Sequence, residues 1–373
     1  MIETRLICTL LLVLAGHLFA PVAQAVDNNF HARIVLFIQQ DADPPERYLE
    51  RLESLAVRTE SFFANGLNRW KRPVEREQCF ARNKDGKVDV TLVRGKVEAA
   101  GRGALPEIQK QAITGASKAE KLNANQPVVW WILYDYLDVK GFRGGARGLG
   151  GMAINAYPKG NGLIGTDVEL ATPEMAEMAI KGTIHELGHA LGLPHIGPRP
   201  GLKLGNSLMG PVNRAYWGQT GTRDARVHLS EVAAAMLWKH PVFRRNAVSG
   251  RRMPRQIDLQ ELAVTETEDG RSLKIAGTLS ANMPAHTAVL LDSRRANFGD
   301  YWKRPYAGAI DKETGAFEII VTEPFDRGTL YLSFCFENGT VTADGQKPFQ
   351  QSSAIEITYD GEQGSRTFGL PAD

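Results

Sequence analysis

The sequence carries almost no excess of charge of either sign. Lysine and arginine number 44 against 42 aspartates and glutamates, which leaves a formal net charge of +2. Proteins that bind nucleic acid concentrate positive charge to meet the phosphate backbone, and this composition shows no such concentration. We therefore predict no nucleic-acid partner. A content of 43% hydrophobic and 23% charged residues is that of an ordinary globular protein.

Long apolar runs are scarce, and the one that stands out lies at the N-terminus. Residues 6–20 are largely apolar, but the run is too short for a comfortable membrane span. Arg5 precedes it, and Ala23-Gln24-Ala25 supplies the small residues of a cleavage site. We predict a signal peptide over residues 1–25, a secreted or periplasmic protein, and no membrane contact after cleavage. An uncleaved N-terminal anchor is the alternative.

Cysteine is nearly absent, with three in the whole chain. Cys8 belongs to the predicted signal peptide, which leaves Cys79 and Cys335 in the mature protein. An oxidising compartment would allow these two to pair and so tie two parts of the chain together. Two separate buried thiols are the other interpretation.

Residues 26–250 alternate between strand-like apolar runs and helix-like periodic stretches. The predicted strands cover 34–38, 88–92, 127–136 and 151–157, and the predicted helices start near 45, 105, 172 and 230. The glycine-dense stretch 141–151 is followed by no helical pattern, so a mobile loop is the better interpretation. Residues 210–229 also predict a loop.

The composition changes at a basic, proline-containing linker over residues 244–255. Beyond it, short β-rich runs separated by turn signals predict a β-sandwich over residues 256–373, separable from the rest of the chain. The runs lie at 273–275, 288–291, 317–321, 330–336 and 355–359. Tyr301, Trp302 and Tyr306 suggest a platform for a glycan or matrix ligand, although aromatic residues more often serve as core packing.

The most informative segment runs from His185 to His195 and reads HELGHALGLPH. On a helix, His185 and His189 stand one turn apart on the same face and can bind one Zn²⁺. The carboxylate of Glu186 lies beside the first ligand and can reach a water at the metal. Gly192 permits a positive φ, which would turn the chain and bring His195 round as a third ligand. Three protein ligands leave a fourth position open, which is typical of catalytic zinc.

This segment resembles the signature HExxHxxGxxH of the metzincin clan of zinc peptidases, and its wording is most similar to the matrixin branch. A candidate Met-turn follows, with Met209 lying 14 residues after His195. Pro211 occupies the position where some branches of the clan place a tyrosine ligand, so a fifth ligand is not expected. The resemblance covers roughly residues 28–250. It implies an α+β catalytic domain over residues 26–250, with a twisted mixed sheet and a zinc-binding helix.

The resemblance implies a secreted zinc endopeptidase acting on a protein or peptide substrate. In this hypothesis Glu186 is the general base, and His185, His189 and His195 hold one catalytic Zn²⁺. Residues 152–157 would hold an extended peptide by strand addition. Two alternatives remain: a zinc-dependent amidase or deacylase with the same chemistry, and a non-catalytic adhesion protein with a vestigial protease domain. The intact set of four residues disfavours the latter.

Overall fold

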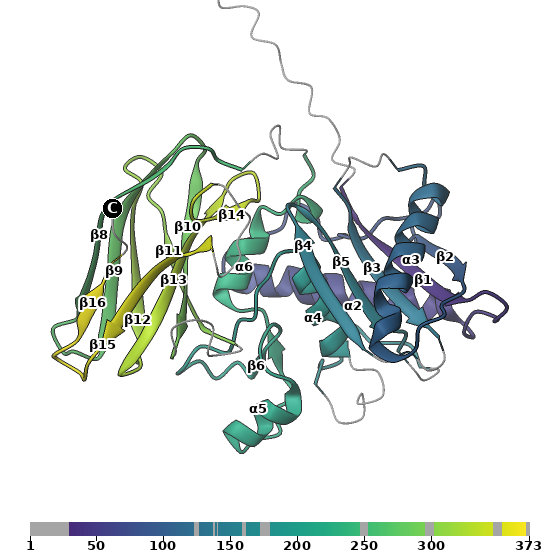
Figure 1. Ribbon diagram of the computed structural model, residues 1–373, viewed down its shortest axis with the longest axis horizontal. Coiled ribbons are helices and arrows are strands. Elements are labelled where there is room, and N and C mark those ends of the chain that lie inside the picture. The colour runs from purple at the N-terminus through teal and green to yellow at the C-terminus, as the bar shows by residue number, and fades with distance from the viewer. Residues whose placement is uncertain are drawn as a thin grey trace, which may run out of the picture.

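The computed structural model describes residues 30–122, 127–136, 139, 141–158, 162–171, 180–246, 253–294, 302–345 and 353–370. The predicted signal peptide, the predicted helix start at residue 172, Tyr301 and part of the predicted linker lie outside these ranges. Within them the protein is a mixed α/β structure with two groups of sheets (Figure 1). None of the described helices is long and apolar enough to cross a membrane.

A five-stranded sheet with the order β2-β1-β3-β5-β4 forms the centre of the N-terminal part. Its strands are β1 (Ala32–Gln39), β2 (Val90–Gly95), β3 (Val129–Asp135), β4 (Phe142–Arg147) and β5 (Gly150–Ala156). All pairs are parallel except β4 with β5. The continuous apolar runs of β1 and β3 are explained by burial on both faces, which parallel sheets require.

Helices cover both faces of this sheet. The short 3-10 helix η1 (Gly101–Ala104) leads into α3 (Leu105–Ala119), which packs on the face that displays Val35 and Phe37 of β1. The opposite face contacts α2 (Tyr48–Arg69) and α4 (Ile180–Ala190), and there β1 contributes Ile34 and Leu36. Successive side chains of a strand point to opposite faces, so one strand contributes to both cores.

Two segments predicted as loops are regular structure. Residues 141–151 form β4 and the turn into β5, so the mobile-loop prediction was wrong. Residues 213–220 form the helix α5 (Asn213–Thr220), which ends at Gly221 with a φ of 68°. Two short strands, β6 (Asn206–Ser207) and β7 (Val227–His228), pair on either side of α5 in the sequence. Helix α6 (Glu231–Trp238) then starts where predicted, with the Ser230 hydroxyl accepting a hydrogen bond from Ala233 N at 3.2 Å.

The C-terminal part consists of two antiparallel sheets that enclose a second core. One contains β8 (Ile257–Glu266), β9 (Ser272–Ala281) and β12 (Ala316–Thr322). The other contains β10 (Ala285–Ser293), β11 (Arg304–Ala309), β13 (Arg327–Phe336), β14 (Val341–Thr342), β15 (Ile355–Asp360) and β16 (Thr367–Gly369). All five predicted β-rich runs fall within these strands.

The two parts share a hydrophobic core across α6, which lies between them (Figure 1). Val289 and Leu291 of β10 and Tyr331 of β13 belong to the same buried cluster as α6 and α2. The 3-10 helix η3 (Pro241–Phe243) follows α6 and is also buried. Lys239 forms an ion pair with Glu337 at 3.0 Å across this boundary. The shared core argues against the independent folding that the linker composition suggested.

The two cysteines of the described chain are unpaired. Cys79 and Cys335 are both buried free thiols, each 1% exposed. Burial raises the pKa of Cys335 to about 12, so this thiol stays protonated and unreactive at neutral pH. Of the two interpretations left open by the sequence, the structure therefore supports separate buried thiols.

Candidate metal centre

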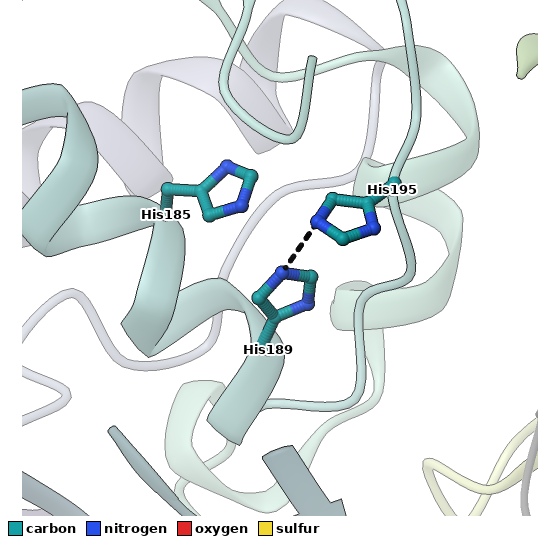
Figure 2. A group of neighbouring side chains, drawn as sticks. All are labelled: His185, His189 and His195. Carbon is teal, nitrogen blue, oxygen red and sulfur yellow. Dashed lines mark hydrogen bonds between the residues drawn. The ribbon is translucent and has the colours of Figure 1, made fainter. Parts of the chain in front are cut away.

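The three histidines of the sequence segment converge on one point (Figure 2). His185 and His189 project from α4, and His195 approaches from the segment that follows the helix. One ring nitrogen from each lies within 4.8 Å of the others. The predicted ligand set is therefore brought together in full, by the helical spacing and the turn that the sequence indicated.

The second ring nitrogens fix the orientation of the two helical histidines. Nδ1 of His185 lies 2.9 Å from the carbonyl of Leu208, and Nδ1 of His189 lies 2.8 Å from that of Leu193. Each carbonyl can only accept, so each Nδ1 donates and each Nε2 keeps its lone pair for a metal. These hydrogen bonds hold the two imidazole rings in the orientation that metal binding needs.

The spacing of the nitrogens fits a small tetrahedral ion. Nε2 of His189 and Nε2 of His195 lie 3.1 Å apart. Two nitrogens at the roughly 2.0–2.1 Å bond length of zinc in tetrahedral geometry would be about 3.3 Å apart. This pair of nitrogens already has the spacing of two ligands of one ion, and a ring nitrogen of His185 lies within 4.8 Å of both.

Burial keeps these imidazoles neutral, as metal binding requires. Burial and the neighbouring His189 lower the pKa of His185 to about 3. Burial, His189 and the cationic Lys303 lower the pKa of His195 to about 4. Burial also lowers the pKa of His189.

Two glycines shape the backbone around the histidines. Gly192 has a φ of 92°, the left-handed conformation that turns the chain back toward His195. At Gly188, an added Cβ would lie 2.5 Å from the sulfur of Met209. Met209 is 1% exposed and packs against the helix between the two helical ligands. This methionine therefore packs against α4 next to the two helical histidines.

Glu186 lies against β4 and is only 4% exposed. An added Cβ on Gly144 of β4 would lie 2.9 Å from its Oε2. Burial raises the pKa of Glu186 to about 7. A carboxyl group with a pKa near neutrality can both accept and return a proton, which is the property that a general base and acid needs.

The strand next to the site differs from the one predicted to hold a peptide. Residues 152–157 largely belong to β5, which pairs with β3 on one side and β4 on the other and has no free edge. The edge strand on this side of the sheet is β4, and β2 forms the other edge. It carries an exposed Phe142 and lies directly over α4. Strand addition would therefore have to occur on β4.

Lys181, which was not predicted from the sequence as a site residue, lies one helical turn before His185. Its side chain is 5% exposed, and Nζ donates a hydrogen bond to the carbonyl of Pro211. Burial lowers the pKa of this amine to about 7. Lys181 thereby joins α4 to the segment that follows Met209. The spacing of four residues between Lys181 and His185 could have indicated that both side chains lie on the same face of α4.

Gly144 is expected to be required for the geometry of the site. In Gly144→Ala the new Cβ would lie 2.5 Å from Glu186 O and 2.8 Å from His189 Cβ, so α4 must move. A displacement near 1 Å at a reacting group costs about 100-fold in rate. We expect Gly144→Ala to lose metal affinity, thermal stability and any hydrolytic activity. Gly145→Ala is the matched control for metal content and melting temperature, because nothing lies within 4 Å of its added Cβ. Equal behaviour of the two variants would contradict this account.

No protein-family model and no curated protein matches this sequence. The whole fold is nevertheless similar to solved structures of OgpA from Akkermansia muciniphila. One is catalytically inactive OgpA in complex with an O-glycopeptide substrate, glycodrosocin. It has a TM-score of 0.66 and 16% identity, and the match covers 93% of this chain and 96% of that one.

Two structures of wild-type OgpA give similar values. The first has a TM-score of 0.66 and 17% identity and covers 92% of this chain and 96% of that one. The second has a TM-score of 0.59 and 18% identity and covers 89% and 96%. The likeness spans both the N-terminal and the C-terminal part, and at this identity it establishes a common fold.

Proposed function

We propose that the protein is a zinc-dependent endopeptidase that cleaves peptide bonds in peptides or O-glycopeptides. The observation that carries the proposal is the convergence of His185, His189 and His195 beside a buried Glu186. The OgpA fold supports it, because one OgpA structure holds an O-glycopeptide substrate. Zinc is the metal that three neutral imidazoles and an open fourth position favour.

We further propose that residues 26–250 form a metzincin-like catalytic domain and that residues 256–373 form an accessory domain. The catalytic domain is supported by the order of the sheet, α4, the turn at Gly192 and the buried Met209. The accessory domain is supported by the second core between the C-terminal sheets. We also propose export, guided by residues 1–25, to the periplasm or the cell exterior. The signal-peptide pattern is the support for this step.

We expect the residues of the chain to have the following roles in the reaction. When bound, zinc polarises the scissile carbonyl and lowers the pKa of a water at the open position. Glu186 accepts a proton from the attacking water through its carboxylate and returns it to the leaving amine. The outer edge of β4 holds the peptide backbone by strand addition, because β4 is the edge strand that lies over α4 and no described strand pairs with its outer N–H and C=O groups.

Metal analysis combined with cleavage assays tests this function. The mature protein should contain one zinc ion and should cleave an O-glycopeptide or its unglycosylated counterpart, and a chelator should stop the cleavage. A paired assay on small acylated amines separates a peptidase from a deacylase or amidase. Cleavage that survives complete metal removal, or activity on small amides alone, would overturn the proposal.

A further inference from the structure

Residues 206–211 form a buried turn beside the metal centre, and all of them are shielded from solvent. Within this turn Gly210 N donates a hydrogen bond to Ser207 O at 3.1 Å, and an added Cβ on Gly210 would collide with the Ser207 hydroxyl. The same hydroxyl donates a hydrogen bond to the carbonyl of Ile196 at 2.5 Å. The 206–211 turn is therefore tightly packed and is joined to the segment that carries the third histidine.

Two of the three histidines are held through the 206–211 turn. His185 Nδ1 donates a hydrogen bond to the carbonyl of Leu208 at 2.9 Å. Ile196 directly follows His195, and its N–H donates a hydrogen bond to Met209 O at 3.1 Å. A shift of the turn would therefore change the orientation of the His185 ring and would move the backbone next to His195.

Two buried side chains fix the end of this turn by donating to one carbonyl. The amine of Lys181 and the side-chain amide of Asn206 both donate hydrogen bonds to Pro211 O, and the Asn206 bond measures 2.8 Å. The Asn206 amide also lies 3.3 Å from Asn213 Oδ1. Lys181 is 5% exposed and Asn206 is 0% exposed. Because Lys181 belongs to α4, its hydrogen bond ties the helix that carries His185 to the turn that orients the His185 ring.

Stability alone does not explain a lysine at this position. Removal of an amine from water is unfavourable, and the hydrogen bond to Pro211 O does little more than offset that cost. An apolar side chain would fill the same space without the cost, but apolar contacts have no preferred direction. Hydrogen bonds favour a narrow range of angles, so two donors on one carbonyl restrict where Pro211 can lie.

We propose that Lys181 and Asn206 are positioning residues of the metal centre. Through the Pro211 carbonyl they hold the 206–211 turn in the place from which it orients His185 and supports the backbone beside His195. The inference rests on the proposed function, in which these histidines hold the catalytic metal. Lys181 and Asn206 act through the turn and touch neither the metal nor the substrate.

Charge repulsion makes the opposite prediction for Lys181. A charged amine one helical turn before His185 would disfavour a divalent cation, so its removal would tighten metal binding. Asn206 carries no charge, and its removal would have no such effect. Positioning predicts weaker metal binding for both residues, so the pair of variants distinguishes the two effects.

Zinc affinity of variants of the full chain tests the proposal, measured by competition with a chelator well below each melting temperature. Lys181→Met keeps the length of the side chain and removes the donor, and Asn206→Leu keeps the approximate shape. Loss of a group that orients a ligand directly costs about 10–100-fold in metal affinity. These two residues act one step further away, so we expect Kd to rise by about 10-fold in each single variant.

The double variant should lose more affinity than the product of the two single losses. Each single variant leaves Pro211 O with one of its two donors, whereas the double variant leaves this buried carbonyl with neither. If the double variant does not fold, the two single variants decide the proposal by themselves.

Cobalt(II) in place of zinc provides a readout that a loss of stability alone would not change. Its visible absorption depends on the arrangement of its ligands, so each cobalt-saturated variant should differ from the wild type. Lys239→Met is the matched control, because the Lys239 side chain is 15% exposed and pairs with Glu337 at 3.0 Å, away from the histidine segments. This control should melt at a lower temperature and keep the wild-type Kd and cobalt spectrum.

The possible outcomes separate this inference from the proposed function. Unchanged zinc Kd and cobalt spectra in both single variants would overturn the positioning role, and so would tighter binding by Lys181→Met. Peptide cleavage by the wild type is measured in parallel. If the variants bind zinc more weakly but the wild type cleaves no peptide, the peptidase function fails and the positioning role stands. A wild type that binds no metal would overturn both.

Discussion

Replacement of Glu186 by glutamine is expected to lower kcat/KM for peptide cleavage by about 10²–10⁴-fold, the range that one general base typically supplies. The amide keeps the size of the side chain but cannot take up a proton. The carboxyl group is buried against Gly144, so glutamine should fit the same space beneath β4.

The metal content of Glu186→Gln should equal that of the wild type, because all three histidines remain. Kinetics with a fluorogenic peptide and zinc analysis of the same preparation provide the measurement. Glu50→Gln is a suitable control, since Glu50 pairs with Arg47 at the exposed start of α2, and both side chains are about half exposed. A Glu186 variant that retains most of the wild-type rate would show that another group is the base.

Replacement of His189 by alanine should remove the metal. His189 supplies the Nε2 that lies 3.1 Å from the His195 nitrogen, and two histidines alone bind zinc far more weakly than three. Loss of an outer partner already costs roughly 10–100-fold in metal affinity, so loss of a ligand should cost more. Binding of a metal to the native state alone adds about 4 kcal/mol of stability at a thousandfold excess over Kd. The rise in melting temperature that zinc gives the wild type should therefore disappear.

His228→Gln is the control that separates ligand loss from general destabilisation. His228 is buried, and its carbonyl accepts a hydrogen bond from Leu208 N at 2.9 Å. Among the described residues its ring belongs to no metal-binding group. This variant should be less stable than the wild type and still bind zinc. Full zinc retention in His189→Ala would show that the three histidines are not the ligand set.

Much of the N-terminal fold and the whole histidine set could be predicted, because their signals are local. A helix places residues four apart on one face, so His185 and His189 needed only helical spacing. The central strands β1 and β3 are continuous apolar runs, because a strand that is buried on both faces carries apolar residues at successive positions.

What the sequence did not reveal depends on contacts between distant segments. β4 was missed because Gly144 and Gly145 carry no side chain to alternate. Gly144 instead lets α4 approach the sheet closely. Helix α5 was missed because none of its residues is buried, which removes the periodic apolar stripe. Arg199, Arg294 and Arg304 line one pocket, and no local pattern links positions that far apart in the sequence.

Helix α6 has a consequence for how the molecule melts. Six of its eight residues, from Val232 to Leu237, are buried, so it has no broad polar face to turn toward water. One side is covered by α2 and the other by β10 and β11. If either part unfolded, α6 would lose the packing on one of its two sides. The remaining part would then lose the contacts that α6 provides. The two parts should therefore lose their structure in a single calorimetric transition, and neither behaves as a module that can be exchanged between proteins without redesign of this helix.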